Sequence, residues 1–236
     1  MSSVVITQSN YIPWRGWFAM ARTSSALVFL DDVQYTRRDW RNRNLIAGPS
    51  GAKWLTIPTA SAGNYKSKIC EIECIDSSWI DSHLSRLDNA YMEYAHYREF
   101  RGDLRSAYEG LGNLKSLSQI NQKLTSWLMT ILKVNLSVYN SKDFVSSGTK
   151  TERLVGICLK LHANEYITGP AAKSYLDENL FNENSINVTW IDYSNLPAIS
   201  VSTPGLQELS IIHVIATRGV DEAIRLSTFL PSLRSS

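Results

Sequence analysis

Two short segments of the sequence carry residue types that could bind a sugar or a phosphate. The first, QSNYIPWRGWF at residues 8–18, directly follows an apolar run at residues 4–7. The polar side chains of Gln8, Asn10 and Tyr11 could hydrogen-bond a sugar or a base. If a helix begins within this segment, its free N–H groups and its dipole favour an anion there. The alternative is a turn whose proline and tryptophans simply fill the core.

The second segment, DDVQYTRRDWRNRN at residues 31–44, combines two carboxylates with aromatic residues and four arginines. Asp31 and Asp32 could accept hydrogen bonds from sugar hydroxyls, or act as a general base for an attacking amine or hydroxyl. Arginine binds phosphate through paired N–H groups, so the segment predicts recognition of a phosphorylated sugar. The alternative is that the acids and arginines pair with one another on a solvated face. The four arginines are Arg37, Arg38, Arg41 and Arg43.

Two later loops also place cations beside small residues. SSGTKTERL, at residues 146–154, has the small-residue loop and helix start of a phosphate site, but an ordinary helix cap explains it equally well. YITGPAAKSYLD, at residues 166–177, places Lys173 shortly after a predicted strand, at the sheet edge expected for Gln8 and Asp32. The alternative is a plain strand-to-helix connection whose glycine and proline serve only the turn.

The tetrapeptide WRGW at residues 14–17 bears on the type of reaction. Nucleotidyltransferase-type α/β proteins carry H-x-G-H at this place, and here Trp14 and Trp17 replace both histidines. Indole cannot replace a charged imidazole that stabilises a transferring phosphate, so adenylyl transfer is disfavoured, whereas stacking of a ligand ring stays possible.

The remaining chemistry-bearing residues predict neither a metal nor a disulfide. The four histidines, His83, His96, His162 and His213, are scattered without metal-ligand spacing, and the three cysteines include no CxxC pair. We therefore expect reduced thiols, no metal and no bound cofactor. A net charge of +2 gives no argument for nucleic acid or a membrane, and no stretch is long enough to span one. We expect a cytoplasmic protein.

Hydrophobic periodicity predicts the elements that must position these residues. Apolar runs at 4–7 and 26–30, with helical spacing between them at 14–23, indicate a strand–helix–strand unit of a parallel sheet. The same rhythm returns late in the chain, with strands expected at 135–141, 165–169 and 187–193 and helices at 151–161, 172–181 and 210–219. The expected fold is therefore α/β, with a mostly parallel sheet, flanking helices and a nucleotide-binding-like arrangement.

Between these two parts, other patterns predict a hairpin and a helical layer. Strand-like pieces at 44–46 and 53–57 flank the turn-rich AGPSG, which is typical of a β-hairpin. Helical periodicity then covers 79–97, 98–111 and 117–132, with breaks expected near Gly102 and Gly110. No linker separates residues 79–133 from the rest, so we expect a helical insertion within a single α/β domain over residues 1–236.

The sequence resembles the WbqC-like family, which is found in bacteria and is associated with gene clusters for surface polysaccharides, other glycans and secondary metabolites. The stretches that carry the resemblance are ITQSNYIPWRGWF, LDDVQYTRRDWRNRN with WLTIP, HLSRLDNAYMEYAHYREF, SQINQKLTSWLMTILKV and ERLVGICLKLHANEYITGPAAKSYLD. Two positions depart from the family pattern. Ser9 stands where the family tends to proline after the glutamine, and His213 stands where it tends to an acidic residue.

The resemblance implies a transferase of glycan biosynthesis that moves an acyl or aminoacyl group to a phosphorylated or nucleotide-linked amino sugar. Its partners would be that small molecule and an acyl or aminoacyl donor. Carried over position by position, the implied site comprises two candidate catalytic carboxylates, Asp31 and Asp32, and a larger binding set. The binding set is Gln8, Tyr11, Trp14, Gly16, Tyr35, Arg38, Arg41, Asn42, Arg43, Lys173 and Tyr175.

Two other functions stay open from the sequence alone. The absence of a nucleophile triad and of metal spacing fits a non-catalytic module that binds a glycan intermediate or assists a partner enzyme. A degenerate H-x-G-H scaffold that still performs nucleotidyl or ATP-dependent chemistry is the third possibility.

Overall fold

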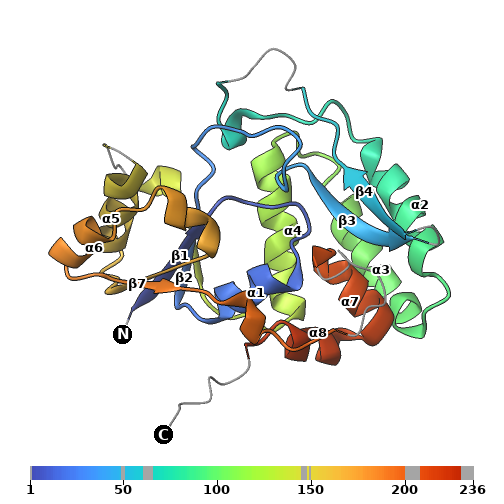
Figure 1. The fold of residues 1–236 in the computed structure, drawn as a ribbon. Helices are drawn as coiled ribbons and strands as arrows, with labels where there is room; N and C mark the ends of the chain where they lie inside the picture. The colour runs from blue at the N-terminus through green and yellow to red at the C-terminus, as the bar shows by residue number, and fades with distance from the viewer. Residues whose placement is uncertain are drawn as a thin grey trace, which may run out of the picture.

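The computed structural model describes residues 2–48, 51–60, 66–144, 148, 150–199 and 208–229. Its centre is a parallel sheet of five short strands, and Figure 1 shows the first of them beginning beside the N-terminus. The first two of these strands along the chain correspond to the apolar runs that the sequence shows at residues 4–7 and 26–30. The five strands are β1 (Ser3–Thr7), β2 (Ala26–Phe29), β5 (Ser137–Asn140), β6 (Glu165–Thr168) and β7 (Asn187–Trp190).

Helices cover both faces of this sheet because alternate strand residues point to opposite sides. Val5 and Leu27 belong to the larger core, which includes residues of α1 (Arg15–Arg22) and α4 (Leu117–Ile131). Their chain neighbours, such as Val4, belong to a second core with residues of α5 (Lys150–Lys160) and α6 (Glu178–Glu183). Figure 1 shows α5 and α6 on one side of the sheet and α4 on the other.

The strand order is β5-β2-β1-β6-β7, and every neighbouring pair is parallel. The chain builds outward from β1 through β2 to β5 and then returns to place β6 on the other side of β1. This reversal is a topological switch point, and open α/β sheets bind ligands outside the carboxyl ends of strands at such points. The loops after β1, β2 and β6 therefore lie where a ligand is expected.

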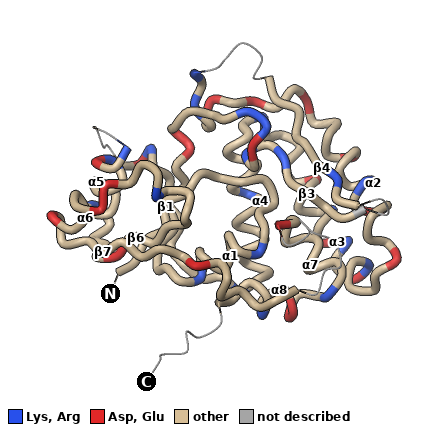
Figure 2. Tube along the Cα trace, in the orientation of Figure 1, with Lys and Arg blue, Asp and Glu red and all other residues tan. Residues whose placement is uncertain are grey.

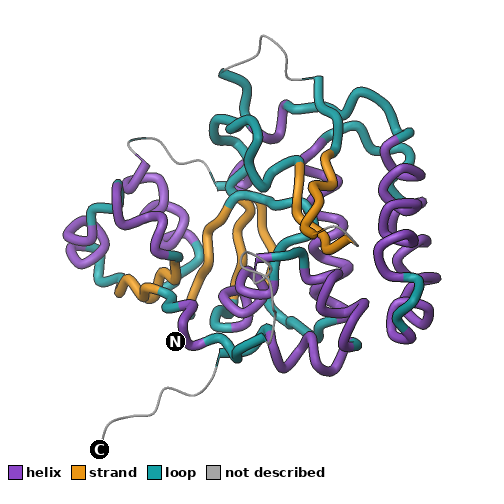
Figure 3. Tube along the Cα trace, turned by 45° about the vertical axis from the view of Figure 1, so that its right-hand side comes forward, coloured by secondary structure: helices purple, strands orange, loops and turns teal. Residues whose placement is uncertain are grey.

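The long connection between β2 and β5 holds the hairpin and the helical layer. Strands β3 (Arg43–Gly48) and β4 (Gly51–Thr56) pair antiparallel and form a separate two-stranded sheet. Helices α2 (Trp79–Tyr91) and α3 (Ala95–Glu109) follow, and α7 (Ile211–Arg218) from the end of the chain packs against α3. Figure 3 shows the hairpin set apart from the parallel strands and flanked by these helices.

The fold class predicted from the sequence is confirmed, and so are the hairpin and the central helices. Three details were wrong. The break between α2 and α3 falls at residues 92–94, and Gly102 lies inside α3. Residues 172–181 do not form one helix: a 3₁₀ helix, η3 (Pro170–Ser174), precedes α6, whose N-cap is Asp177. Gly219 ends α7 as expected, but a further helix, α8 (Val220–Leu226), begins directly after it.

Two further findings concern the described residues only. None of their helices combines the length and the apolar character needed to cross a bilayer. They also contain no group of three or more histidine, cysteine, aspartate or glutamate side chains arranged to hold a metal ion.

Candidate functional site

The turn that follows β1 is held in place by residues much later in the chain. The Tyr11 N–H donates to the Trp40 carbonyl at 2.9 Å. The Asn44 side-chain amide donates to the carbonyls of Tyr11 and Ile12 at 3.0 and 2.9 Å. Ile12 has φ of 36°, a left-handed conformation that is rare for a β-branched residue and persists only where the surroundings enforce it. Hydrogen bonds with Trp40 and Asn44 therefore hold the turn in this conformation.

Tyr11 points into the core rather than toward solvent. Its side chain is fully buried, and its hydroxyl lies 2.8 Å from Nδ1 of His83 and 2.6 Å from the Tyr108 hydroxyl. Nε2 of His83 lies 3.1 Å from the Thr56 carbonyl, which can only accept, so Nε2 carries the proton. Tyr11 then donates to Nδ1 of His83, and Tyr108 donates to Tyr11. Contact between Tyr11 and a ligand stays a prediction that this burial does not favour.

Burial also fixes the charge state of this hydrogen-bond chain. Loss of solvation lowers the pKa of His83 to about 4, although its bond to the Thr56 carbonyl acts in the opposite direction. Burial likewise raises the pKa of Tyr11 well above its usual value. The chain is therefore neutral at physiological pH, and its role in the structure is to tie the first turn to α2 and α3.

Trp14 and Gly16, the next predicted site residues, pack against each other. The Trp14 indole folds back over Gly16 so closely that a Cβ on Gly16 would lie 2.2 Å from the ring. The same indole packs on Tyr193, with ring centroids 5.0 Å apart. The glycine thus makes room for the tryptophan of its own turn, and the second tryptophan of the WRGW motif, Trp17, is buried in the core.

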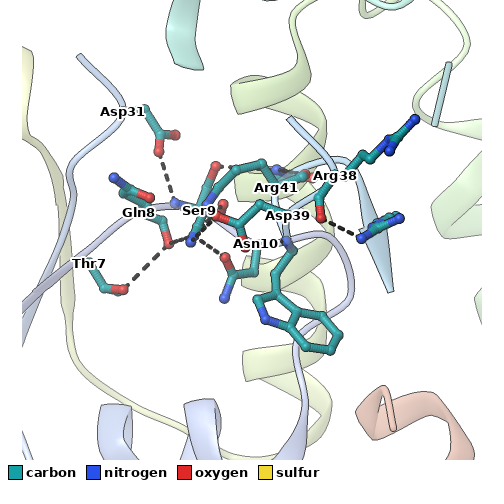
Figure 4. Close-up of polar contacts among 11 residues, drawn as sticks. Thr7, Gln8, Ser9, Asn10, Asp31, Arg38, Asp39 and Arg41 are labelled. Atoms are coloured by element: carbon teal, nitrogen blue, oxygen red, sulfur yellow. Dashed lines mark hydrogen bonds and ion pairs between the residues drawn. The ribbon is translucent and has the colours of Figure 1, made fainter. Parts of the chain in front are cut away.

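Arg41 joins the two predicted segments. Figure 4 shows its guanidinium directed toward the Gln8–Asn10 turn, where it bonds to the Asn10 side-chain oxygen and lies 3.5 and 3.4 Å from the carbonyls of Gln8 and Ser9. Its other terminal nitrogen forms an ion pair with Asp39 at 3.4 Å. Burial lowers the pKa of Arg41, and the charge of Asp39 opposes that shift. These bonds engage both terminal nitrogens of the guanidinium, so Arg41 supports the turn.

Four of the other predicted residues line a cavity of about 440 Å³ together with Arg37 and part of the chain after β4. Tyr35 and Asn42 belong to its wall, and burial raises the pKa of the Tyr35 phenol. No aspartate or glutamate is found among the described residues that line it, so its charge is positive. Figure 2 shows blue segments of the chain gathered above α4, with a red segment among them. The lining residues are Tyr35, Arg37, Arg38, Asn42, Arg43, Thr56, Ile57, Pro58 and Thr59.

Asp31 lies just beyond the end of β2, where it acts as a hydrogen-bond hub. Its side chain is buried, with one oxygen accepting from the Ser9 N–H at 2.8 Å. The other oxygen accepts from the Ser118 hydroxyl and from the Gln122 amide, the latter at 3.1 Å. Asp31 thus connects the turn after β1 to the first turns of α4.

Asp32 is more accessible and has a different set of partners. One oxygen accepts from the Ser141 hydroxyl, and the other forms an ion pair with Arg153 of α5. Burial alone would raise its pKa, but the bonds from Ser141 and Arg153 and the arginine charge hold the pKa of Asp32 below its usual range. Asp32 is therefore ionised at neutral pH, and it is available as a base only if a ligand displaces a partner.

Both aspartates line a second cavity, of about 260 Å³, at the carboxyl ends of β2 and β5. Most of the other side chains in its wall are neutral amides and hydroxyls, groups that hydrogen-bond sugar hydroxyls. Segment 31–43 connects the two cavities, because its first residues line the second cavity and its later residues line the arginine cavity. The second cavity is lined by Phe29, Asp31, Asp32, Cys70, Ser116, Ser118, Gln119, Gln122, Asn140, Ser141 and Lys142.

Lys173 and Tyr175 line neither cavity. The Lys173 ammonium lies 5.5 Å from the ring centroid of Trp190, and Lys150 lies 5.4 Å from that of Tyr175. They occupy the loop after β6, on the other side of the switch point. Ser147 and Thr149 of the predicted phosphate loop lie outside the described residues.

The sequence analysis missed several residues that build these cavities. Ser118, Gln122 and Ser141 are ordinary polar side chains in helical or loop segments, and no local pattern marks them as partners of the aspartates. Arg153 belongs to the segment 146–154 that was singled out for a phosphate, but the structure pairs it with Asp32 and it lines neither cavity. Residues 56–59 were assigned only to the hairpin and its exit, although they form one wall of the arginine cavity. The WLTIP stretch that ends there was already part of the family resemblance, and this was the available signal.

Comparisons with known proteins identify the family of the chain. The model of a family described as the WbqC-like protein family matches residues 8–224, which include both cavities. The chain is similar to an uncharacterised protein of Mycobacterium tuberculosis, Rv1507c, with 39% identity over 193 residues. That alignment covers 82% of this chain and 83% of the relative. No solved structure matches the chain.

Proposed function

We propose that this chain, which belongs to the WbqC-like protein family, is a transferase that binds a phosphorylated or nucleotide-linked sugar in the arginine cavity. The group transferred is an acyl or aminoacyl group, and the process is bacterial glycan biosynthesis. The reaction type and the process rest on the family resemblance. The location of the phosphate rests on the charge and shape of the cavity.

The observation that carries the proposal is the 440 Å³ cavity lined by Arg37, Arg38 and Arg43 with no acid among its described lining residues. Its volume falls in the range of small-molecule sites. Guanidinium groups form paired, charge-assisted bonds to phosphate, and these are stronger than neutral hydrogen bonds. A positive cavity of this size therefore favours a small ligand that carries phosphate.

The second cavity supplies the chemistry that the transfer would need. An amine of the sugar attacks the acyl carbon, its proton passes to a base, and the donor group leaves with the electron pair of the broken bond. Asp32 is the better candidate for that base because its side chain is more accessible than that of Asp31, which is buried and holds the turn and α4 together. The neutral amides and hydroxyls of this wall would orient the sugar hydroxyls.

The experiment that tests the proposal is a thermal-shift and calorimetric screen of nucleotide sugars, sugar phosphates and inorganic pyrophosphate. Arg38→Ala and Arg43→Ala should each weaken binding at least tenfold, which is the size of a lost hydrogen bond to a charged group. Arg98→Ala is the matched control because Arg98 is an exposed arginine of α3 that lines neither cavity. Equal binding by all three variants would refute the site.

A second candidate, a module that binds the same ligand without transforming it, is favoured by one observation. Both candidate carboxylates already accept hydrogen bonds from the protein, so neither is a free base in this structure. Asp32→Asn separates the two candidates: a transferase loses turnover while binding persists, whereas a binding module shows no turnover even as the unchanged protein. Stabilisation by ATP with release of pyrophosphate would instead favour nucleotidyl chemistry.

A further inference from the structure

The guanidinium of Arg43 lies over an aromatic ring on the neighbouring strand. Its central carbon is 4.0 Å from the ring centroid of Trp54. The hairpin register explains the contact, because Arg43 of β3 pairs with Thr56 and Trp54 lies two residues away on the same face of β4. A diagonal neighbour at this spacing is within reach of a long side chain.

The hydrogen-bond acceptor that Arg43 meets is neutral. Within the part of the chain that the structure describes, no ion pair is found for Arg43, and its Nη2 donates to the Arg38 carbonyl. Its buried Nε has no hydrogen-bond partner. An acid would neutralise the guanidinium and occupy its N–H groups, whereas a ring contacts only the face of the guanidinium and leaves its charge in place.

Trp54 is itself fixed from two sides. Its ring packs on Trp40, with centroids 5.4 Å apart, and its carbonyl accepts a hydrogen bond from Arg86 of α2 at 2.8 Å. Trp54 is nevertheless 37% exposed, which is more than expected for a residue that only fills the core. Its position thus combines a main-chain hydrogen bond, ring packing on Trp40 and contact with the Arg43 guanidinium.

We propose that Trp54 is a positioning residue of the arginine cavity, which holds the Arg43 guanidinium in place for a phosphate without neutralising it. The inference rests on the proposed function, since it assumes that Arg43 binds the anionic part of the ligand. Trp54 does not line the cavity and acts only through Arg43. The predicted consequence is that anion affinity depends on an aromatic face at residue 54.

The test measures the affinity for inorganic pyrophosphate by calorimetry in four variants of the full chain. Trp54→Leu keeps an apolar side chain without a π-face and should weaken binding about two- to fivefold, the size of an exposed cation–π contact. Trp54→Phe retains a ring and should restore most of the affinity. Arg43→Ala should lose at least tenfold. Tyr139→Ala removes an equally exposed ring from β5 and should change nothing.

The outcomes separate the two proposals. If Arg43→Ala binds pyrophosphate as tightly as the unchanged protein, the arginine cavity is not the anion site and the role of Trp54 falls with it. If Arg43→Ala weakens binding but Trp54→Leu does not, the anion site stands and the positioning role is refuted. Equal weakening by Trp54→Leu and Trp54→Phe also refutes it, because a ring at residue 54 would then bind the guanidinium no better than an aliphatic side chain. Melting temperatures show which variants remain folded.

Discussion

Replacement of Asp31 by alanine should destabilise the protein far more than replacement of any exposed aspartate. The substitution removes the acceptor of three donors, namely the Ser9 N–H, the Ser118 hydroxyl and the Gln122 amide. Hydrogen bonds to a charged group contribute roughly 1.5–3 kcal/mol each, but bonds that share one carboxylate are not additive. Since Ser9 and Ser118 are both buried, water cannot replace the lost acceptor without a rearrangement.

We therefore expect Asp31→Ala to lower the free energy of unfolding by about 3–5 kcal/mol. For a chain of this size the melting temperature should fall by roughly 10 °C. Asp31→Asn keeps an acceptor for Ser9 but turns an amide N–H toward two donors, so its loss should be intermediate.

The assay is urea unfolding followed by circular dichroism, with Asp103→Ala as the control. Asp103 is an exposed aspartate of α3, and its replacement should cost less than about 0.5 kcal/mol. If Asp31→Ala costs less than about 1 kcal/mol, the hub does not hold the turn to α4. Asp31 would then again be an equal candidate for the catalytic base.

Three further predictions concern the support of the site. His83 has a pKa of about 4 in the folded chain and about 6.5 when unfolded, so the unfolded state binds its proton first as pH falls. Its contribution to the free energy of unfolding is complete above pH 6.5 and should fall by about 2 kcal/mol at pH 5. Urea unfolding above pH 6.5 and at pH 5 measures this loss, and the loss should be absent in His83→Gln. Arg41→Ala should cost about 2 kcal/mol in urea unfolding, and Arg41→Lys should not recover it because one ammonium cannot serve both Asp39 and the turn. Gly16→Ala should cost about 1–3 kcal/mol in the same assay because its Cβ would collide with Trp14, and an unchanged stability would contradict the packing described here.

Elements whose signals are local were predictable from the sequence, and elements fixed by distant partners were not. Strands β1 and β2 follow from continuous apolar runs, and α1 follows from helical spacing after a proline. The helix expected at 172–181 failed because its start was placed at the turn residues rather than at Asp177, whose side chain caps α6. An aspartate before Glu178 is a recognisable helix start, so this error was avoidable.

The candidate site shows the same division. Arginines and aspartates at the carboxyl ends of strands were predictable, since topology brings those ends to one edge. The direction of each side chain was not. Tyr11 turns inward to bond with His83 and Tyr108. These partners are 72 and 97 residues away in the sequence, so no local pattern predicts the contact. Arg41 and Arg43 are the same residue type in the same segment, but Arg41 bonds to the turn and Arg43 lies against Trp54.

The conformation of the turn after β1 depends on hydrogen bonds from distant parts of the chain. Its main-chain groups at Ser9, Tyr11 and Ile12 bond to Asp31, Arg41, Trp40 and Asn44, and the Pro13 carbonyl accepts from Ile211 in α7. A peptide that contains only the first turn and the arginines would lack the last of these contacts. The basic segment is thus not a portable motif: grafted onto another scaffold, its arginines would be present and their arrangement would be lost.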